Sequence, residues 1–249
     1  MLRDPAPPVD ALAGPSDRAL LRLQAISGLA FATFLLLHLA NTMLATLGQG
    51  RYDGFQRGVR GYYQWAPIEL SVVIAAPLVH VAAAAVRILR RRRLRAKTGR
   101  TPPGAPGWRV RLHRYSGYYL VVVVVGHMLA TRAPGVFLGI PADFSFLTFS
   151  LESMPLFFYP YYISFAFCGV IHVTHGTLLA LRVLGLRLPS WATAPRSRPF
   201  WVVVSLAALM ALAGVLALGG AFHPVDRGRF GEFRALYERL LPEGARPWD

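Results

Sequence analysis

Four histidines lie at matching places in four long apolar stretches of this 249-residue chain. An ionisable side chain in such a stretch is costly and usually faces the interior of a helix bundle. A hydrogen bond to the next helix explains one buried histidine, but it is a weaker explanation for four at repeated spacings. Neutral imidazole is a good ligand for iron, and a haem held between two helices needs one histidine from each. The predicted haem-iron ligands are His38, His80, His127 and His172.

The sequences around these histidines indicate a two-helix hairpin that is used twice. In the first and third stretches, SGLAFATFLLLH and SGYYLVVVVVGH, a glycine precedes the histidine by ten residues (Gly28 and Gly117). In the second and fourth, LVHVAAAA and VIHVTHG, a small residue follows the histidine by four, and in the fourth it is Gly176. A glycine lets a flat macrocycle or a neighbouring backbone come close. The three glycines are predicted to line the cofactor site, although ordinary small-residue helix packing explains Gly176 equally well.

The composition places these stretches in a membrane. Hydrophobic residues make up 54% of the chain and the mean hydropathy is +0.41, yet the formal net charge is +15. Five apolar segments reach the ~20 residues that cross a hydrocarbon core. The one cysteine, Cys168, leaves neither a disulfide framework nor a cysteine-based metal site. The predicted fold is all-α, an integral membrane bundle of five transmembrane helices over roughly 20–47, 67–88, 110–132, 156–181 and 200–222.

Basic residues are distributed unevenly between the two ends of the expected bundle. With the N-terminus on the cytoplasmic side, 18 of the 27 lysines and arginines fall in the inner segments 1–22, 87–114 and 182–198, and 9 fall in the outer segments. Positive residues favour the cytoplasmic side, which predicts a multi-pass protein of the cell membrane, N-in and C-out. The run RILRRRRLRAK (87–97) then lies near anionic lipid headgroups, and no nucleic-acid partner is needed to explain it.

Three regions follow from this topology. Residues 1–19 carry proline and acid where a signal peptide has a basic start and an apolar run, so a cytoplasmic leader is expected. Residues 20–222 form the five-helix domain, and residues 223–249 an amphipathic tail on the outer face. Apolar residues at steps of three and four predict a short surface helix in this tail. They are Phe230, Phe233, Leu236, Tyr237, Leu240 and Leu241.

The depths of the four histidines divide them into two pairs. At ~1.5 Å rise per residue, His38 and His127 lie ~24 and ~20 Å from the basic residue at the inner end of their helix. His80 and His172 lie only ~15 Å from theirs. The first pair therefore belongs near the outer face and the second near the cytoplasm. Two haems, each with two histidine ligands, would divide the membrane crossing of an electron into shorter steps.

With these residues in place, the sequence resembles a known family, the five-span di-haem cytochrome b subunit of succinate dehydrogenases and fumarate reductases. The resemblance covers roughly 20–186 and depends on SGLAFATFLLLHL, LVHVAAAAVR, RLHRYSG with GHM, and IHVTHG. It implies that His38 and His127 hold the outer haem b, and that His80 and His172 hold the inner one. The family's fourth ligand is followed by a glycine four residues later, which favours His172 over His175.

The resemblance also implies partners and an electron path through the complex. In that family the subunit passes electrons between membrane quinone and an iron–sulfur subunit, with a flavoprotein docked on the cytoplasmic face. Menaquinone is favoured over ubiquinone as the quinone of the di-haem form. Some of these fumarate reductases carry a glutamate two residues before the fourth ligand, for transmembrane proton movement. Val170 occupies that place here, so a mechanism that needs this glutamate is in doubt.

A quinone site needs a flat apolar slot with groups that manage protons. The stretch YYQWAPIE contains Glu69, the only acid near the start of the second span, and we expect it to handle quinone protons. The competing interpretations are structural: aromatic residues belong to the interfacial belt of any membrane protein, and Glu69 follows Pro67 in the first turn of a helix, where an acid is favourable.

Two other functions remain open on sequence grounds. The first is the di-haem subunit of another quinone-linked dehydrogenase, although those generally carry two histidines on one helix. The second is a haem-free transporter or structural anchor, whose histidines are polar contacts or a proton path. The spans have no broken helix pair to favour a transporter. The sequence assigns no role to His113 or His175; His175 is expected to reach a haem propionate, a water chain or a neighbouring helix.

Overall fold

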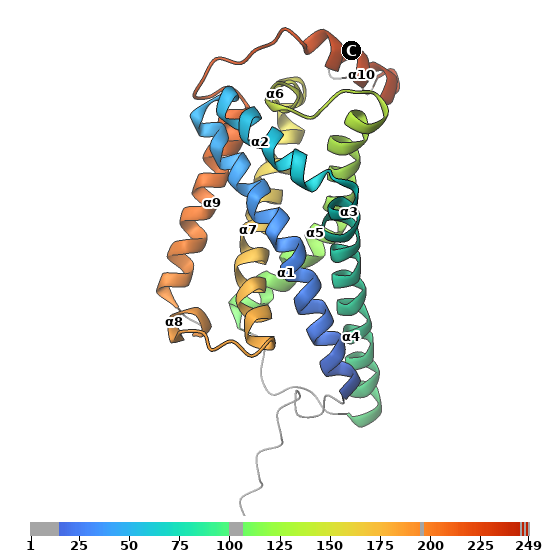
Figure 1. The fold of residues 1–249 in the computed structure, drawn as a ribbon, viewed down its shortest axis with the longest axis vertical. Coiled ribbons are helices and arrows are strands. Elements are labelled where there is room, and N and C mark those ends of the chain that lie inside the picture. Colours follow the sequence, from blue (N-terminus) through green and yellow to red (C-terminus); the bar gives the residue numbers. More distant parts are fainter. Residues whose placement is uncertain (1–14, 100–106, 195–196, 245, 247, 249) are drawn as a thin grey trace, which may run out of the picture.

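The computed structural model describes residues 15–99, 107–194, 197–244, 246 and 248, and every regular element in them is helical (Figure 1). The long helices are α1 (Pro15–Leu44), α4 (Ala76–Thr98), α5 (Trp108–Phe137), α7 (Pro155–Val183) and α9 (Arg198–Leu218). The shorter ones are the 3₁₀-helix η2 (Ala45–Leu47), α2 (Gln49–Tyr63), α3 (Ala66–Ile68), the π-helix η3 (Glu69–Ala75), α6 (Phe144–Ser153), α8 (Ser190–Thr193) and α10 (Phe230–Leu240).

Among the described residues, five helical segments are long and apolar enough to cross a membrane, which agrees with the predicted number of spans. They are Pro15–Leu47, Ala66–Thr98, Trp108–Phe137, Pro155–Val183 and Arg198–Leu218. Many of their large apolar side chains point outward, as lipid contact requires; Val122 is 79% exposed and Leu209 61%. The chain is therefore a multi-pass membrane protein. Most of the predicted leader, residues 1–14, lies outside the described residues, and α1 begins at Pro15, inside the predicted leader.

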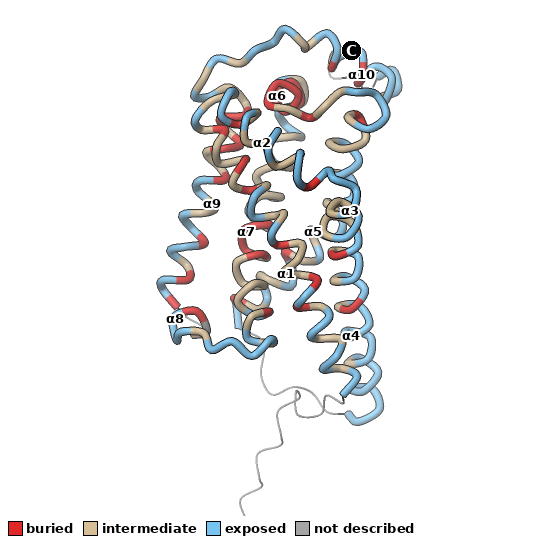
Figure 2. Tube along the Cα trace, viewed as in Figure 1, coloured by how far each residue is buried: buried red, intermediate tan, exposed pale blue. Residues whose placement is uncertain are grey.

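Helices α1 and α7 form the centre of the bundle. Helix α1 packs against α4, α7 and α9, and α7 also packs against α5 and α9. One end of the bundle carries α2, α6 and α10, and we call it the cap end (Figure 1). The other end carries the start of α1, the arginine-rich end of α4 and α8, and we call it the basic end. Figure 2 shows that α4 is mostly exposed toward the basic end.

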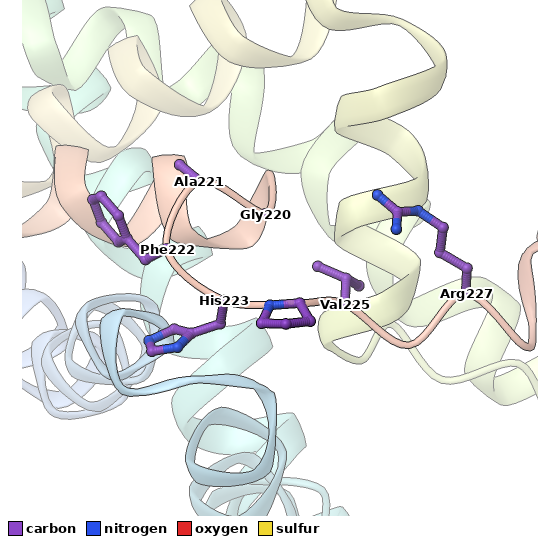
Figure 3. A pocket seen from close by; sticks show the side chains of 7 residues that line it. Gly220, Ala221, Phe222, His223, Val225 and Arg227 are labelled. Atoms are coloured by element: carbon purple, nitrogen blue, oxygen red, sulfur yellow. The ribbon is translucent and has the colours of Figure 1, made fainter.

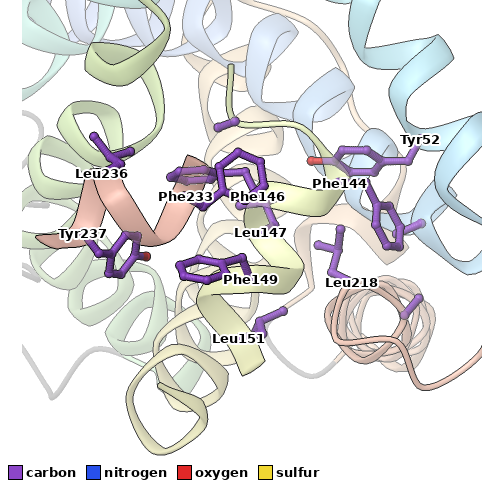
Figure 4. Packing of buried hydrophobic residues seen from close by; sticks show 13 residues of the cluster. Tyr52, Phe144, Phe146, Leu147, Phe149, Leu151, Leu218, Phe233, Leu236 and Tyr237 are labelled. Carbon is purple, nitrogen blue, oxygen red and sulfur yellow. The ribbon is translucent and has the colours of Figure 1, made fainter. Parts of the chain in front are cut away.

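The cap is a small hydrophobic core that the sequence analysis did not foresee. Eight consecutive residues of α6, 144–151, are buried, and α10 packs Phe233 and Leu236 onto them (Figure 4). The Oγ1 hydroxyl of Thr148 donates to the carbonyl of Leu218 at 2.6 Å, which fastens the cap to α9. A short helix, α10, lies within the predicted tail, and its buried residues pack against α6.

Candidate functional site

The four predicted histidines come together in two pairs, each formed across two helices. The rings of His38 (α1) and His127 (α5) have centroids 5.8 Å apart, toward the cap end. The rings of His80 (α4) and His172 (α7) have centroids 6.2 Å apart, toward the basic end. These are the partners that the depth argument expected. An imidazole nitrogen lies about 2 Å from a bound metal ion, so two imidazoles on opposite sides of one metal have ring centroids about 6 Å apart. Both pairs match this distance.

Backbone carbonyls orient the two histidines of the basic-end pair. Nδ1–H of His80 donates to the carbonyl of Gln24 on α1 at 2.9 Å, and Nδ1–H of His172 donates to the carbonyl of His113 on α5 at 3.2 Å. Metal-ligating histidines almost always donate their second ring N–H in this way, which fixes the tautomer. Each bond leaves the Nε2 nitrogen unprotonated and available to a metal.

Glycines allow this close approach between helices. A Cβ on Gly28 would lie 2.7 Å from Nδ1 of His80, and one on Gly117 would lie 2.9 Å from Cε1 of His172. The two contacts have the same register, since Gln24 precedes Gly28 by four residues and His113 precedes Gly117 by four. The sequence spacing related each glycine to the histidine on its own helix. In the structure, each glycine contacts the histidine of the neighbouring helix.

The third predicted glycine lies beside a histidine that the sequence left without a role. A Cβ on Gly176 would lie 3.2 Å from Cε1 of His113. The ring of His113 stacks on that of His172, with centroids 4.3 Å apart and an interplanar angle of 12°. His113 therefore supports His172 twice, through its backbone carbonyl and through its ring, and Gly176 leaves room for that ring.

The cap-end pair is surrounded by aromatic side chains. Phe34 stacks one turn before His38 on α1, with ring centroids 5.7 Å apart. On α7, the Tyr161 hydroxyl lies 3.2 Å from Nδ1 of His127, and the Phe165 ring lies 4.8 Å from the His127 ring. No pattern in the sequence assigned a role to Tyr161. The Tyr161 hydroxyl is a hydrogen-bond partner for Nδ1 of His127, as the backbone carbonyls are for Nδ1 of the two histidines in the basic-end pair.

His175 contacts a neighbouring helix, one of the three roles left open for it. Its Nδ1 accepts a hydrogen bond of 2.8 Å from Nε of Arg109 on α5. Its ring also meets the His113 ring edge-on, at a centroid distance of 4.9 Å. His175 is thus held beside the basic-end pair and has no counterpart across the bundle like those of His80 and His172.

Glu69 forms an ion pair that the sequence analysis missed. Nε and Nη2 of Arg132, near the end of α5, donate to its two carboxylate oxygens at 2.6 and 2.9 Å. Glu69 also begins the π-helix η3, a rare element that is frequent at functional sites. Arg132 lies five residues beyond His127, about 7.5 Å along the helix axis toward the cap end. The carboxylate is thus on the cap-end side of the His38–His127 pair.

Within the described residues there is no group of three or more His, Cys, Asp or Glu side chains placed to hold a metal ion. A haem iron needs only two axial side chains, because the macrocycle supplies the other ligands. Paired histidines, nitrogens oriented by carbonyls, and glycines against the imidazoles therefore fit two haems better than a bare metal.

Two hollows lie apart from the histidine pairs. One, of about 280 Å³, is lined by the loop 220–225 and Arg227 at the cap end, where His223 donates to the Thr46 carbonyl at 2.8 Å (Figure 3). The other, of about 250 Å³, is an apolar groove between α1, α7 and α9, near Trp191 of α8. Neither hollow contains a histidine of the two pairs.

Comparisons of this chain with protein-family models, with curated proteins and with solved structures found no match.

Proposed function

We propose that this chain is the di-haem cytochrome b membrane subunit of a succinate:quinone oxidoreductase. The observation that carries the proposal is the presence of two cross-helix histidine pairs, 5.8 and 6.2 Å between ring centroids, each suited to one iron. Gln24 and His113 occupy equivalent positions in their helices, and each accepts a hydrogen bond from a histidine of the neighbouring helix. This equivalence also supports the repeated hairpin expected from the sequence. In this proposal the dicarboxylate site belongs to a partner subunit, and this chain transfers electrons between its partners.

In this proposal the protein holds and orients two b haems, which supply one-electron transfer when bound. His38 and His127 ligate the outer haem, and His80 and His172 the inner one. The carbonyls of Gln24 and His113 fix the tautomer and the ring orientation of the inner imidazoles. All four histidines are partly buried between the helices.

The basic end is the cytoplasmic side in this proposal, and the N-terminus is inside. The positive-inside distribution supports this, because α4 ends in the arginine-rich run while the cap has mixed charge. The iron–sulfur subunit, with the flavoprotein, docks at the basic end, beside the inner haem. Anionic lipid headgroups contact the same arginines.

The quinone, menaquinone by preference, is reduced or oxidised near Glu69 at the outer haem in this proposal. A carboxylate on the cap-end side of the His38–His127 pair can exchange protons with a quinone as electrons pass. The bidentate bond from Arg132 orients the Glu69 carboxylate, whose oxygens would accept the proton of a quinol.

A reduced-minus-oxidised absorption spectrum of the purified chain tests the haem assignment. We expect a b-type signal and two haems per chain, because each histidine pair holds one. A spectrum without a b-type band would exclude the proposed function. In the isolated complex, succinate should reduce the haems; reduction by another donor but not by succinate would assign the chain to a different quinone-linked dehydrogenase.

Glu69→Gln tests the quinone site. The amide keeps the shape of the side chain but cannot take a proton, so quinone-linked turnover should fall by about 10²-fold, the usual contribution of a general acid or base. Both haems should still be reduced by a chemical reductant, which separates proton handling from haem binding.

Glu152→Gln is the matched control for this variant. Glu152 is also an arginine-paired glutamate, bound by Arg227 at 2.7 Å, but it lies on the exposed side of the cap. We expect the control to keep the turnover of the native chain. Equal losses in the two variants, or no loss in Glu69→Gln, would place quinone chemistry elsewhere.

A further inference from the structure

Arg109 is a buried arginine at the basic end of α5, and its side chain is held on several sides. The residue is 7% exposed. Its Nε donates to Nδ1 of His175 at 2.8 Å, and its Nη2 and Nη1 donate to the carbonyls of Ala192 and Ala194 at 2.8 and 3.3 Å. The guanidinium also stacks over the Phe200 ring, 3.6 Å from its centroid. These contacts tie α5 to α7, α8 and α9.

None of the ion pairs found among the described residues includes Arg109. The other buried or half-buried arginines at the basic end differ in this respect, since Arg87 pairs with Asp17. An arginine remains charged at any physiological pH. Arg109 therefore places a permanent positive charge, which no described carboxylate neutralises, inside the bundle, where salt screening is weak.

A continuous set of contacts joins this charge to the inner ligand. Arg109 bonds to His175, whose ring meets that of His113 at 4.9 Å, and the His113 ring stacks on that of His172 at 4.3 Å. Since Arg109 donates to Nδ1 of His175, this nitrogen carries no proton and the ring is fixed as the Nε2–H tautomer. Nδ1 of His113 is buried without a hydrogen-bond partner, and the His113 ring stacks on the His172 ring.

We propose that Arg109, acting through His175 and His113, is a positioning residue that raises the reduction potential of the inner haem. The inference rests on the proposed function, because it requires a haem on His80 and His172. Reduction adds one electron to the ferric haem, and a nearby fixed cation stabilises the ferrous form relative to the ferric form. A higher reduction potential of the inner haem means that an electron shared by the two haems is found more often on the inner one, which is nearest the proposed iron–sulfur partner. The cap-end pair lies at the other end of the bundle, so its potential should respond much less.

The test is a potentiometric titration of both haems in three variants of the full chain. Arg109→Gln removes the charge but keeps an amide that can donate to the α8 carbonyls. His175→Glu leaves Arg109 in place and supplies the carboxylate that the described site lacks. Arg111→Gln is the control, because Arg111 lies two residues away on the same helix but is exposed to the surroundings. The haem that is lost in His172→Ala identifies the inner potential.

We expect Arg109→Gln and His175→Glu each to lower the inner potential, and Arg111→Gln to leave it unchanged. The equilibrium constant for reduction should fall at least about threefold, which is about 30 mV at 59 mV per tenfold for a one-electron couple. If Arg109→Gln does not assemble, His175→Glu tests the same charge. Unchanged inner potentials in both variants, or an equal shift in Arg111→Gln, would overturn this inference while leaving the haem assignment intact. A native chain without haem would instead overturn the proposed function.

Discussion

Replacing His172 with alanine is expected to halve the haem content of the purified chain, from two haems to one. His172 supplies the only α7 ring within ligand distance of His80, and alanine leaves the inner iron with one protein ligand. The outer pair draws on α1 and α5, so the second haem should remain with its spectrum unchanged. The measurement is the haem-to-protein ratio, taken together with the reduced-minus-oxidised spectrum.

The matched control is His175→Ala, three residues along the same helix. His175 bonds Arg109, and its ring meets that of His113 on α5 rather than that of His80. The variant should therefore retain two haems, although the inner one can shift in potential. Two haems in His172→Ala and one in His175→Ala would show that the ligand assignment is wrong. Two haems in both variants would point to a ligand elsewhere in the chain.

The spans and the partners of the histidines could be predicted from sequence because both depend on position along a helix. A run of about 20 apolar residues fixes a span, and a fixed rise per residue fixes the depth of a histidine within it. Two histidines at one depth can meet if the two hairpins pack together. Helix α1 packs on α4 within the first expected hairpin, α5 packs on α7 within the second, and the contact of α1 with α7 joins the two hairpins.

The cap could not be predicted, because α6 lacks a readable pattern. Its sequence FSFLTFSLES is too short to span a membrane and has no polar face, since it is buried on all sides. Its partners are remote in sequence: the Ser145 hydroxyl donates to the carbonyl of Asp226 at 2.8 Å, 81 residues away. The Glu69–Arg132 pair was missed for the same reason, as 63 residues separate its members.

The support of the inner ligands was missed for a different reason. Gln24 and His113 occupy the same register, four residues before Gly28 and Gly117, but their side chains are unlike each other. The group that contacts the imidazole is the backbone carbonyl, which every residue carries, so the side-chain sequence gives no sign of it. The Ser-Gly pairs were the available signal, because a missing Cβ indicates that something approaches closely.

Alanine at Gly28 or at Gly117 is expected to remove most of the inner haem and to leave the outer haem in place. The added Cβ would lie 2.7 Å from the His80 ring or 2.9 Å from the His172 ring, so the imidazole must move away from its carbonyl partner. Overpacking of this kind typically costs about 1–3 kcal/mol. Alanine is also a better helix former than glycine by about 1 kcal/mol, so helix weakening cannot account for a loss.

Gly126→Ala is the control for this pair of variants. Gly126 adjoins the outer ligand His127 on α5, but a Cβ there would meet nothing within 4 Å, so both haems should remain. Haem counts and the two midpoint potentials distinguish the outcomes. Loss of the outer haem in Gly28→Ala or Gly117→Ala would mean that each glycine supports the histidine ten residues along its own helix. Loss of the inner haem alone would mean that α1 and α5, which carry the outer ligands, also shape the inner site.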